Sequence, residues 1–517
     1  MRRAERRRPE HGPSYSETGI AAPVRGLNTK TSLAGMAQDY ALVLDNWVCQ
    51  PDALVSRLGA ENYSTGFTVP PKSLHRYSSA SGDDFFAAAD DGIYDITSAG
   101  AVGAAVTSLI SGQARSVNFS TSAGQYLVLV NGADNLKLYD GTTWVTVTGV
   151  STPAITGPGT ETLTHVETYR QRLFFLPKQA LSFYYLPIDS VGGAATEFRI
   201  GAICRRGGRV ISHATWTFDG GAGSDDCYVV ATSEGEVVVF TGSDPSDPTA
   251  WTLKGVYYIG EPLGPNCLVK VGGDLLYLCA AGLLPLSKAL QTATIDYRTA
   301  LTDNIQPTIT LAAQVSATNY GWQTQPFPAM NLLLVNVPVD SDTSEQYCFS
   351  TLSRGWSRFT NWNATSWIEH NGSLYFTHAG GVAKALTGYS DFGSNIVATM
   401  DTAYNRFGTR RQLQPAQMRF LLATTGPVQY TVGFATDFSD EYAEQIMSTG
   451  NFTVGLWDSG LWDTALWGTG YSLQKSWITV PAYGGIALST RLRVESTTIS
   501  STLIAMDYLL LRQGLIS

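Results

Sequence analysis

The sequence predicts a mainly β protein with a β-propeller-like central domain. The clearest sign is a two-strand unit in residues 126–144, YLVLVNGADNLKLYDGTTW, where two apolar runs are followed by Asn131-Gly132 and Asp140-Gly141. Asn-Gly and Asp-Gly favour positive φ and therefore tight turns between antiparallel strands. The chain also has 51 glycines and only 15% charged residues, a composition that favours β architecture over helical bundles.

Looser copies of this unit recur along the middle of the chain. They lie at residues 85–96, 173–186, 227–240, 275–287, 332–350 and 373–386, and a tryptophan follows the second strand at Trp144, Trp251 and Trp356. Units of roughly 40 to 60 residues that cannot bury their own apolar face are what a propeller produces by packing blades radially. An irregular array of β-sandwiches is the alternative, because the period and the strand count drift between copies.

Bulk properties exclude several classes of protein. The chain of 517 residues is long enough for two or three domains, and its net charge of −9 does not suit a body that grips nucleic acid through phosphates. We expect no secretory signal and no membrane span, since the most apolar stretch, residues 275–286, is short and broken by Pro285. The six cysteines are scattered, which predicts reduced core residues and not a zinc site or a disulfide frame.

The N-terminal region has two parts. Residues 1–25 carry a run of arginines among prolines, which predicts a basic, disordered arm. Residues 26–62 predict a docking or platform segment, in which Asp45-Asn46 forms a turn and Trp47 anchors the chain in a pocket. The contact residues expected in this segment are Leu27, Asn28, Leu33, Met36, Leu44 and Trp47.

Four phrases in the N-terminal segment carry a family resemblance: Gly26–Thr29, Leu33–Met36, Asp45–Trp47 and Arg57–Gly59. They resemble the opening of the tail-tube nozzle, or packaged-DNA stabilisation, proteins of short-tailed bacteriophages. This chain lacks the prolines expected directly after Met36 and Trp47.

The C-terminal region carries the second part of the resemblance. The phrase LWDSGLWDTALWG, residues 456–468, places Trp457, Trp462 and Trp467 five residues apart. Five matches neither the helical nor the strand period, so we predict three successive turns that each fold a tryptophan inward. Leu-Trp-Asp repeats of this kind are similar to those near the C-terminus of the nozzle family.

The resemblance implies a propeller carried on a β-rich platform that both termini build. The expected domains are the propeller-like part at residues 63–388 and a C-terminal platform domain at residues 389–517. A glycine-rich loop with Arg205, Arg206 and Arg209 fits either a channel lining or, as we favour, an exposed hairpin tip.

No enzyme is expected from the motifs. The chain has no G-x-S-x-G, H-E-x-x-H or P-loop pattern, and its histidines and carboxylate pairs are isolated or lie in turns. We therefore expect no catalytic residues, no cofactor and no metal.

The resemblance implies a structural virion protein of the tail. Its expected partners are further copies in a hexameric ring, a head-to-tail adaptor, a tail fibre or tailspike, a tail needle or plug, and the host envelope. DNA is expected to pass through the ring without specific binding. The alternative is a propeller that binds a receptor or degrades a glycan, because exposed aromatic clusters suit sugars as well as packing.

Overall fold

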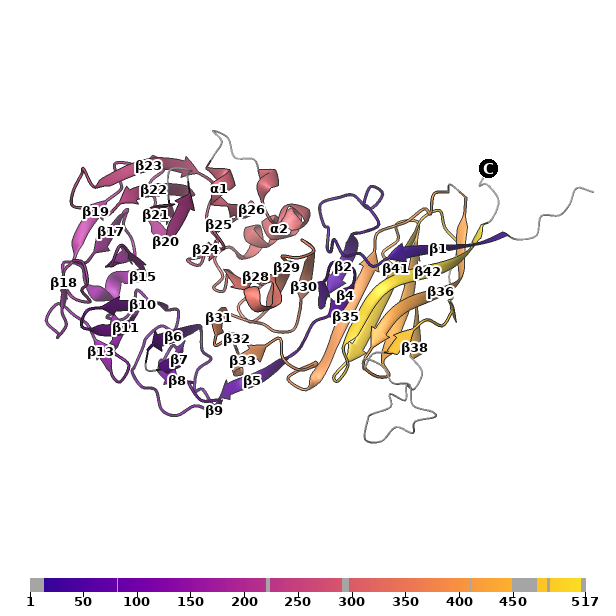
Figure 1. Ribbon diagram of the computed structural model, residues 1–517, viewed down its shortest axis with the longest axis horizontal. Coiled ribbons are helices and arrows are strands. Elements are labelled where there is room, and N and C mark those ends of the chain that lie inside the picture. Colours follow the sequence, from indigo (N-terminus) through magenta and orange to yellow (C-terminus); the bar gives the residue numbers. More distant parts are fainter. Residues whose placement is uncertain are drawn as a thin grey trace, which may run out of the picture. The chain divides into compact units, whose positions relative to one another are not determined.

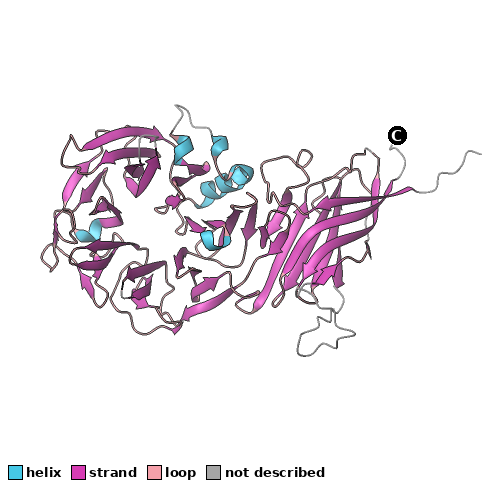
Figure 2. Cartoon of the chain, in the orientation of Figure 1, coloured by secondary structure: helices cyan, strands magenta, loops and turns pink. Residues whose placement is uncertain are grey.

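The computed structural model describes residues 14–80, 82–219, 224–290, 297–409, 411–448, 472–480 and 484–512. The chain divides into two compact units, of which one comprises residues 1–59, 349–358 and 388–517 and the other residues 60–348 and 359–387. We call the first the terminal unit, because both ends of the chain belong to it, and the second the propeller unit. Strands make up most of both units (Figure 2).

The propeller unit is a circle of small antiparallel sheets, or blades (Figure 1). Five blades are separate sheets of three or four strands, and two more, β27 to β29 and β31 to β33, are parts of a larger sheet. In chain order the blades of the described residues are β6 (Ser73–Ser79), β7 (Gly82–Ala89) and β8 (Gly92–Asp95); β10 (Arg115–Thr121), β11 (Gly124–Val130), β12 (Lys137–Tyr139) and β13 (Trp144–Thr146); β15 (Leu163–Tyr169), β16 (Arg172–Pro177), β17 (Ser182–Tyr185) and β19 (Thr196–Arg199); β20 (Val210–Asp219), β21 (Ser224–Thr232), β22 (Glu236–Gly242) and β23 (Trp251–Tyr258); β24 (Leu268–Val271), β25 (Asp274–Cys279) and β26 (Gly282–Pro285); β27 (Gln323–Phe327), β28 (Leu332–Pro338) and β29 (Ser344–Ser350); and β31 (Ser366–His370), β32 (Ser373–His378) and β33 (Gly381–Ala385).

Strands from both ends of the propeller unit close the circle. The innermost strands touch in the order β6, β10, β15, β20, β24, β27 and β31, and β31 contacts β6 again. At the start of the unit, β5 (Ala60–Thr65) pairs with β33 at its end, and β9 (Gly100–Ala101) pairs with β5. The predicted propeller is confirmed, and a linear array of sandwiches is excluded.

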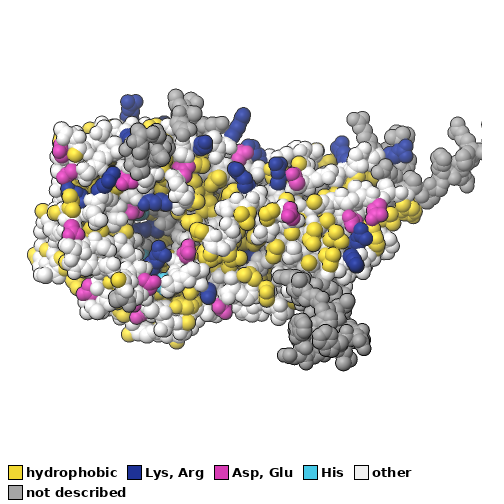
Figure 3. Space-filling view, in the orientation of Figure 1, with side chains coloured by type: hydrophobic (Ala, Val, Ile, Leu, Met, Phe, Trp, Pro, Cys, Tyr) yellow, Lys and Arg dark blue, Asp and Glu magenta, His cyan; other side chains and the backbone are white. Residues whose placement is uncertain are grey.

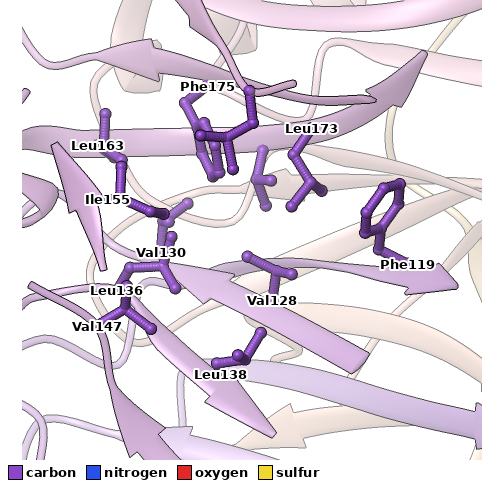
Figure 4. Close-up of a cluster of buried hydrophobic side chains, with 12 residues drawn as sticks. Phe119, Val128, Val130, Leu136, Leu138, Val147, Ile155, Leu163, Leu173 and Phe175 are labelled. Atoms are coloured by element: carbon purple, nitrogen blue, oxygen red, sulfur yellow. The ribbon is translucent and has the colours of Figure 1, made fainter. Parts of the chain in front are cut away.

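Each repeat predicted from the sequence forms the second and third strands of a blade. In the clearest one, Leu127 and Leu129 of β11 pack against the preceding blade, whereas Val128 and Val130 pack against the following one. Figure 4 shows the second cluster, in which Leu173 of β16 belongs to the same apolar group. Alternate side chains of a strand point to opposite faces of its sheet. A middle strand of a blade packs against a neighbouring blade on each face, so both of its faces are apolar and it appears in the sequence as an unbroken apolar run.

Short elements connect the blades. They are β14 (Ile155–Thr156) paired with β18 (Gly193–Ala194), the helices α1 (Leu286–Ala289) and α2 (Gln306–Ser316), and the 3-10 turns η1 (Thr160–Thr162), η2 (Tyr297–Thr299), η3 (Asp303–Ile305) and η4 (Pro328–Met330). Among the described residues, no helix combines the length and apolar character that crossing a bilayer requires.

The terminal unit contains two packed β-sheets. The first consists of β1 (Ser14–Ala21), β3 (Trp47–Cys49), β4 (Leu54–Ser56), β36 (Leu413–Thr424), β39 (Ser472–Gln474), β40 (Ile478–Thr479) and β42 (Ser501–Arg512). The second contains β2 (Ala41–Asp45), β35 (Ser394–Thr402), β37 (Gln429–Thr436), β38 (Ala443–Ser448) and β41 (Leu488–Ser496), with β30 (Trp356–Phe359) and β34 (Ser390–Asp391) at its margin. Side chains meet between the sheets, as where the Phe420 and Tyr430 rings lie 6.1 Å apart.

The terminal unit corrects one prediction and refines another. The disordered arm predicted for residues 1–25 is wrong for residues 14–21, which form β1 along β42 from Ser14 with Arg512 to Ala21 with Ala505. Pairing with a distant strand orders this segment, whose own composition is polar. The division between the units falls after residues 59 and 387, close to the boundaries predicted after 62 and 388, but it adds the unpredicted segment 349–358 to the terminal unit.

Candidate functional site

At the start of the N-terminal phrase, contacts with other residues determine the backbone positions of Gly26, Leu27 and Asn28. Gly26 has a φ of +80°, and a Cβ there would lie 2.2 Å from the carbonyl oxygen of Trp356, so only glycine fits. Leu27 N–H donates to the same carbonyl at 2.6 Å. Asn28 Oδ1 accepts from the backbone N–H groups of Lys30 and Thr31 at 3.0 Å, which shapes the loop that follows.

The turn at Asn46 is the centre of a buried polar network. Asn46 has a left-handed φ of 61°, its Nδ2 donates to the carbonyl of Val397 at 2.8 Å, and its Oδ1 accepts from Arg57 Nε at 2.8 Å. Arg57 also forms a two-pronged ion pair with Asp391, at 2.8 Å for Nη1 to Oδ1 and 2.6 Å for Nη2 to Oδ2. The side chains of Arg57 and Asp391 are 0% and 5% exposed.

The same network lies where the chain leaves and re-enters the terminal unit. Gly59 N–H donates to the carbonyl of Gly388 at 3.0 Å, and a Cβ on Gly59 would lie 1.9 Å from the carbonyl oxygen of Ser390. Gly59 therefore permits the close approach of two backbone segments, and the Arg57–Asp391 pair fixes their register.

The structure places most of the predicted contact residues in the core of the terminal unit. Leu27, Asn28, Met36, Leu44 and Trp47 are buried there. They are therefore used for internal packing, and their burial fits the platform part of the prediction. Leu33 differs, because its side chain is 39% exposed.

A groove in the terminal unit brings the N-terminal loop together with C-terminal strands. It has a volume of about 320 Å³, and Asn28, Leu33 and Met36 line it on one side. On the other side Arg491 binds Asp401 with two hydrogen bonds of 2.8 Å. The groove is the part of the terminal unit where predicted contact residues reach the surface.

The propeller unit contains a second candidate site, an axial cavity of about 690 Å³. In Figure 3 the centre of this unit is hollowed, and dark blue Lys and Arg side chains are visible there. Each of the seven innermost strands supplies lining residues, and the charged or imidazole-bearing ones are His75, Arg76, Arg115, His165, Glu167, His213, Lys270 and Glu369. These residues were not predicted as a site, because in the sequence a polar residue on an innermost strand looks like any solvent-facing strand position.

Three histidines of the cavity are neutral in the folded protein. Burial lowers the pKa of His75 and of His165 to about 3, the positive charge of Arg115 adds to the effect on both, and burial also places the pKa of His213 well below its ordinary value. His75 Nε2 and Nδ1 each lie 2.8 Å from a serine hydroxyl, those of Ser73 and Ser116. These hydrogen bonds satisfy the uncharged ring.

The carboxylates and cations further along the innermost strands are balanced. Lys270 lies near Glu167 and lowers the pKa of that carboxyl, although burial raises it overall. Lys270 Nζ also donates to Thr215 Oγ1, and Arg76 Nη1 donates to the carbonyl of Glu369 at 3.2 Å. Two basic and two acidic side chains thus face this part of the cavity.

Two further predicted sites have different outcomes. Arg205, Arg206 and Arg209 are exposed, and the backbone N–H groups of the first two donate to the Glu236 carboxylate. The guanidinium of Arg206 lies 3.6 Å from the centre of the Tyr258 ring. The arginine loop is exposed, as favoured from the sequence, but the predicted hairpin tip is wrong, because the loop connects β19 of one blade to β20 of the next.

Trp457, Trp462 and Trp467 lie outside the described residues, so the predicted tryptophan turns stay a prediction. Within the described ranges, no three His, Cys, Asp or Glu side chains are grouped in a way that would hold a metal ion.

Comparisons with known proteins yield structural likeness only. No family model matches the chain, and no curated protein matches it. The folded chain is similar to BBS1N in complex with ARL6DN, with a TM-score of 0.38, 10% identity, and coverage of 65% of this chain and 99% of that one. It is also similar to Saccharomyces cerevisiae Sqt1 (TM-score 0.36, 10% identity, 67% of this chain and 96% of that one) and to a putative 6-phosphogluconolactonase from Bacteroides fragilis (0.34, 11%, 63% and 87%).

The class of protein is therefore defined by the fold itself: a β-propeller whose sequence lies between the N-terminal and C-terminal segments of a terminal β unit and is interrupted by residues 349–358 of that unit.

The buried ion pair gives a first prediction. Arg57→Met leaves the Asp391 carboxylate buried without its partner, so we expect the terminal unit to lose about 3–5 kcal/mol of unfolding free energy. Urea titration followed by hydrogen exchange of β35 and β42 measures the loss. Arg25→Met is the matched control, because the Arg25–Asp39 pair is exposed and its removal should cost less than about 1 kcal/mol. Equal losses in the two variants would contradict this role of Arg57.

The depressed pKa of His75 gives a second prediction. Between pH 6.5 and 3 the unfolded chain binds a proton on this residue and the folded chain does not, so the stability is complete above pH 6.5 and falls as the pH is lowered. In His75→Gln the slope of unfolding free energy against pH should decrease by up to about 1.4 kcal/mol per unit between pH 4 and 6. Ser116→Ala removes a hydrogen bond without removing a titrating group, and its slope should equal that of the wild type. An unchanged slope in His75→Gln would show that this histidine titrates normally.

Proposed function

We propose that this chain is a structural virion protein that forms the distal tail tube, or nozzle, of a short-tailed phage. The proposal is supported by the way in which the residues of the N-terminal phrase hold the terminal unit together. Gly26, Asn46, Arg57 and Gly59 each occupy a position that tolerates little else, and together they join N-terminal and C-terminal segments in one β unit. A resemblance in residues that connect the two ends of the chain is more informative than a similarity in composition.

In this proposal the terminal unit is the platform that neighbouring copies and the adaptor contact. A closed ring repeats one heterologous interface around an axis, and six copies would carry a net charge of about −54 at neutral pH. Such a ring repels phosphates, so DNA passes through it without sticking. The protein retains the packaged genome before infection and conducts it during ejection.

The adaptor contact is assigned to the groove of the terminal unit. Leu33 is exposed at this groove, and the buried residues Asn28 and Met36 hold the loop that presents it. Exposed leucines at a groove supply apolar area to an interface.

A propeller that binds or degrades a glycan is the second candidate. The polar axial cavity of the propeller unit favours it, because a concave site with a few placed polar groups is the usual form of a small-molecule site.

Assembly distinguishes the two functions. We expect the purified chain to form rings in mass photometry and to co-migrate with the adaptor ring, because the proposed nozzle is a ring of several copies that binds the adaptor. Arrays of neutral glycans and glycan hydrolysis assays on the same preparation should give no signal. A monomer or trimer that binds or cleaves glycans would instead establish the second function.

A surface substitution tests the groove. Deleting residues 26–47 is unsuitable, because Leu44 and Trp47 are 0% exposed and their loss would unfold the terminal unit. Leu33→Asp should fold normally but weaken adaptor binding by about 10-fold or more, as expected when a charge is placed in an apolar contact. Leu352→Asp, at a leucine that is 56% exposed in the same unit, should bind like the wild type. If Leu33→Asp completes tail-less particles as well as the wild type, the groove is not the contact.

A further inference from the structure

The axial cavity of the propeller unit contains an arginine without a counter-ion. Arg115 is the first residue of β10, lines the cavity and is only partly exposed. In the described part of the chain its side chain has no hydrogen bond and no ion pair. A guanidinium cannot lose its proton at physiological pH, so Arg115 presents a positive charge to the cavity.

The surroundings of Arg115 come from blades all around the circle. Its charge acts on His75 of β6 and on His165 of β15, and it interacts with Tyr320 and with Cys267, which precede β27 and β24. Because groups on four other blades or their connections lie within electrostatic range, the guanidinium lies near the axis of the propeller.

All four of these neighbours are neutral at pH 7. The two histidines have pKa values of about 3, burial raises the pKa of Tyr320, and burial raises the pKa of Cys267 to about 12. Within the described ranges, no carboxylate is among the groups that act on the charge of Arg115, and Glu167 lies near Lys270.

Two buried imidazole nitrogens of the same cavity have no hydrogen-bond partner among the described residues. They are His165 Nδ1 and His213 Nε2, and the two rings lie 4.7 Å apart. The Tyr228 hydroxyl is bonded to His213 Nδ1, and the raised pKa of Tyr228 keeps that hydroxyl protonated. If Tyr228 donates, His213 Nε2 carries the ring hydrogen and is available as a donor.

We propose that the axial cavity binds a small oxyanion, a carboxylate or phosphate group, through the guanidinium of Arg115. The planar fork of arginine matches the two oxygens of such a group, and charge-assisted hydrogen bonds of this kind are the strong ones. The cavity is larger than a phosphate ion, and the balanced pairs further along the strands can accept the neutral, hydroxyl-bearing part of a larger molecule. The proposal is independent of the nozzle function, because the cavity lies wholly in the propeller unit.

Calorimetric titration of the full chain tests the proposal with inorganic phosphate and D-glucuronate as the two anionic probes and D-glucose as the neutral one. Ionic strength is held at about 0.15 M with chloride, because a surface charge effect would be screened there. We expect phosphate, glucuronate or both to bind and glucose not to bind. A signal with phosphate alone identifies a phosphate site, and one with glucuronate alone a carboxylate site.

The matched variants are Arg115→Met and Arg209→Met, which remove an arginine from the cavity and from the exposed loop. Arg115→Met should weaken anion binding about 10- to 100-fold, the range expected for a charge-assisted hydrogen bond, while Arg209→Met binds like the wild type. Without anion, the melting temperature of Arg115→Met should equal or exceed that of the wild type, because an uncompensated charge has been removed. If neither anion binds, if glucose binds as well as glucuronate, or if Arg115→Met binds unchanged, the proposal is wrong.

A structure of the wild-type chain with phosphate gives a second measurement that needs no variant. A phosphate within hydrogen-bond distance of the Arg115 guanidinium supports the site. Water alone in the cavity at saturating phosphate overturns it, even if Arg115→Met fails to fold.

Discussion

The ion pair between Arg57 and Asp391 joins the N-terminal and C-terminal segments of the terminal unit, and the rest of that unit depends on their alignment. The chain leaves the terminal unit at residue 59 and returns at residue 388, more than three hundred residues later, and the pair lies at this crossing. A buried ion pair contributes little net stability, since desolvation offsets most of the Coulomb attraction. Here the ion pair instead aligns segments of the chain. The Arg57 side chain binds both Asp391 and Asn46, and so it fixes three segments relative to one another.

The same constraint explains why the N-terminal phrase is so specific. Asn46 supplies both a left-handed turn and an amide whose two ends are bonded, and aspartate in its place could not donate to Val397. Gly26 and Gly59 are required by carbonyl groups that would otherwise clash with a Cβ. Once these residues are set, β2 and β35 can pair, with Asp45 opposite Thr399, and the C-terminal strands can assemble on a sheet edge that N-terminal strands provide.

The sequence predicted the propeller because each blade carries its own local signal. An apolar run and a turn with positive φ mark the middle strands of a blade, as in residues 126–144, and these signals need no knowledge of distant contacts. Long-range pairing is a different matter. The sequence SYSETGIA contains little that distinguishes β1 from a disordered arm, and only its ladder with β42, almost five hundred residues away, orders it.

The candidate sites show the same division. Arg57 and Gly59 stood out within a phrase, but Asp391 did not, because a single aspartate at the end of a two-residue strand has no local mark of its role. The residues of the axial cavity were invisible for a related reason. His75, Arg115 and His165 are far apart in the chain and become a group only when the circle closes.

Arg57 and Arg115 show two different environments for an arginine in this protein. Arg57 has its full set of oxygen partners within the protein, including both oxygens of one carboxylate, so its charge serves the fold. Arg115 faces a polar cavity, and the described groups that interact with its charge are neutral at pH 7. A folded chain gains no stability from keeping such a group, since an apolar residue of similar size would avoid the desolvation cost. An oxyanion bound in the cavity would supply the negative charge that the described side chains around Arg115 do not.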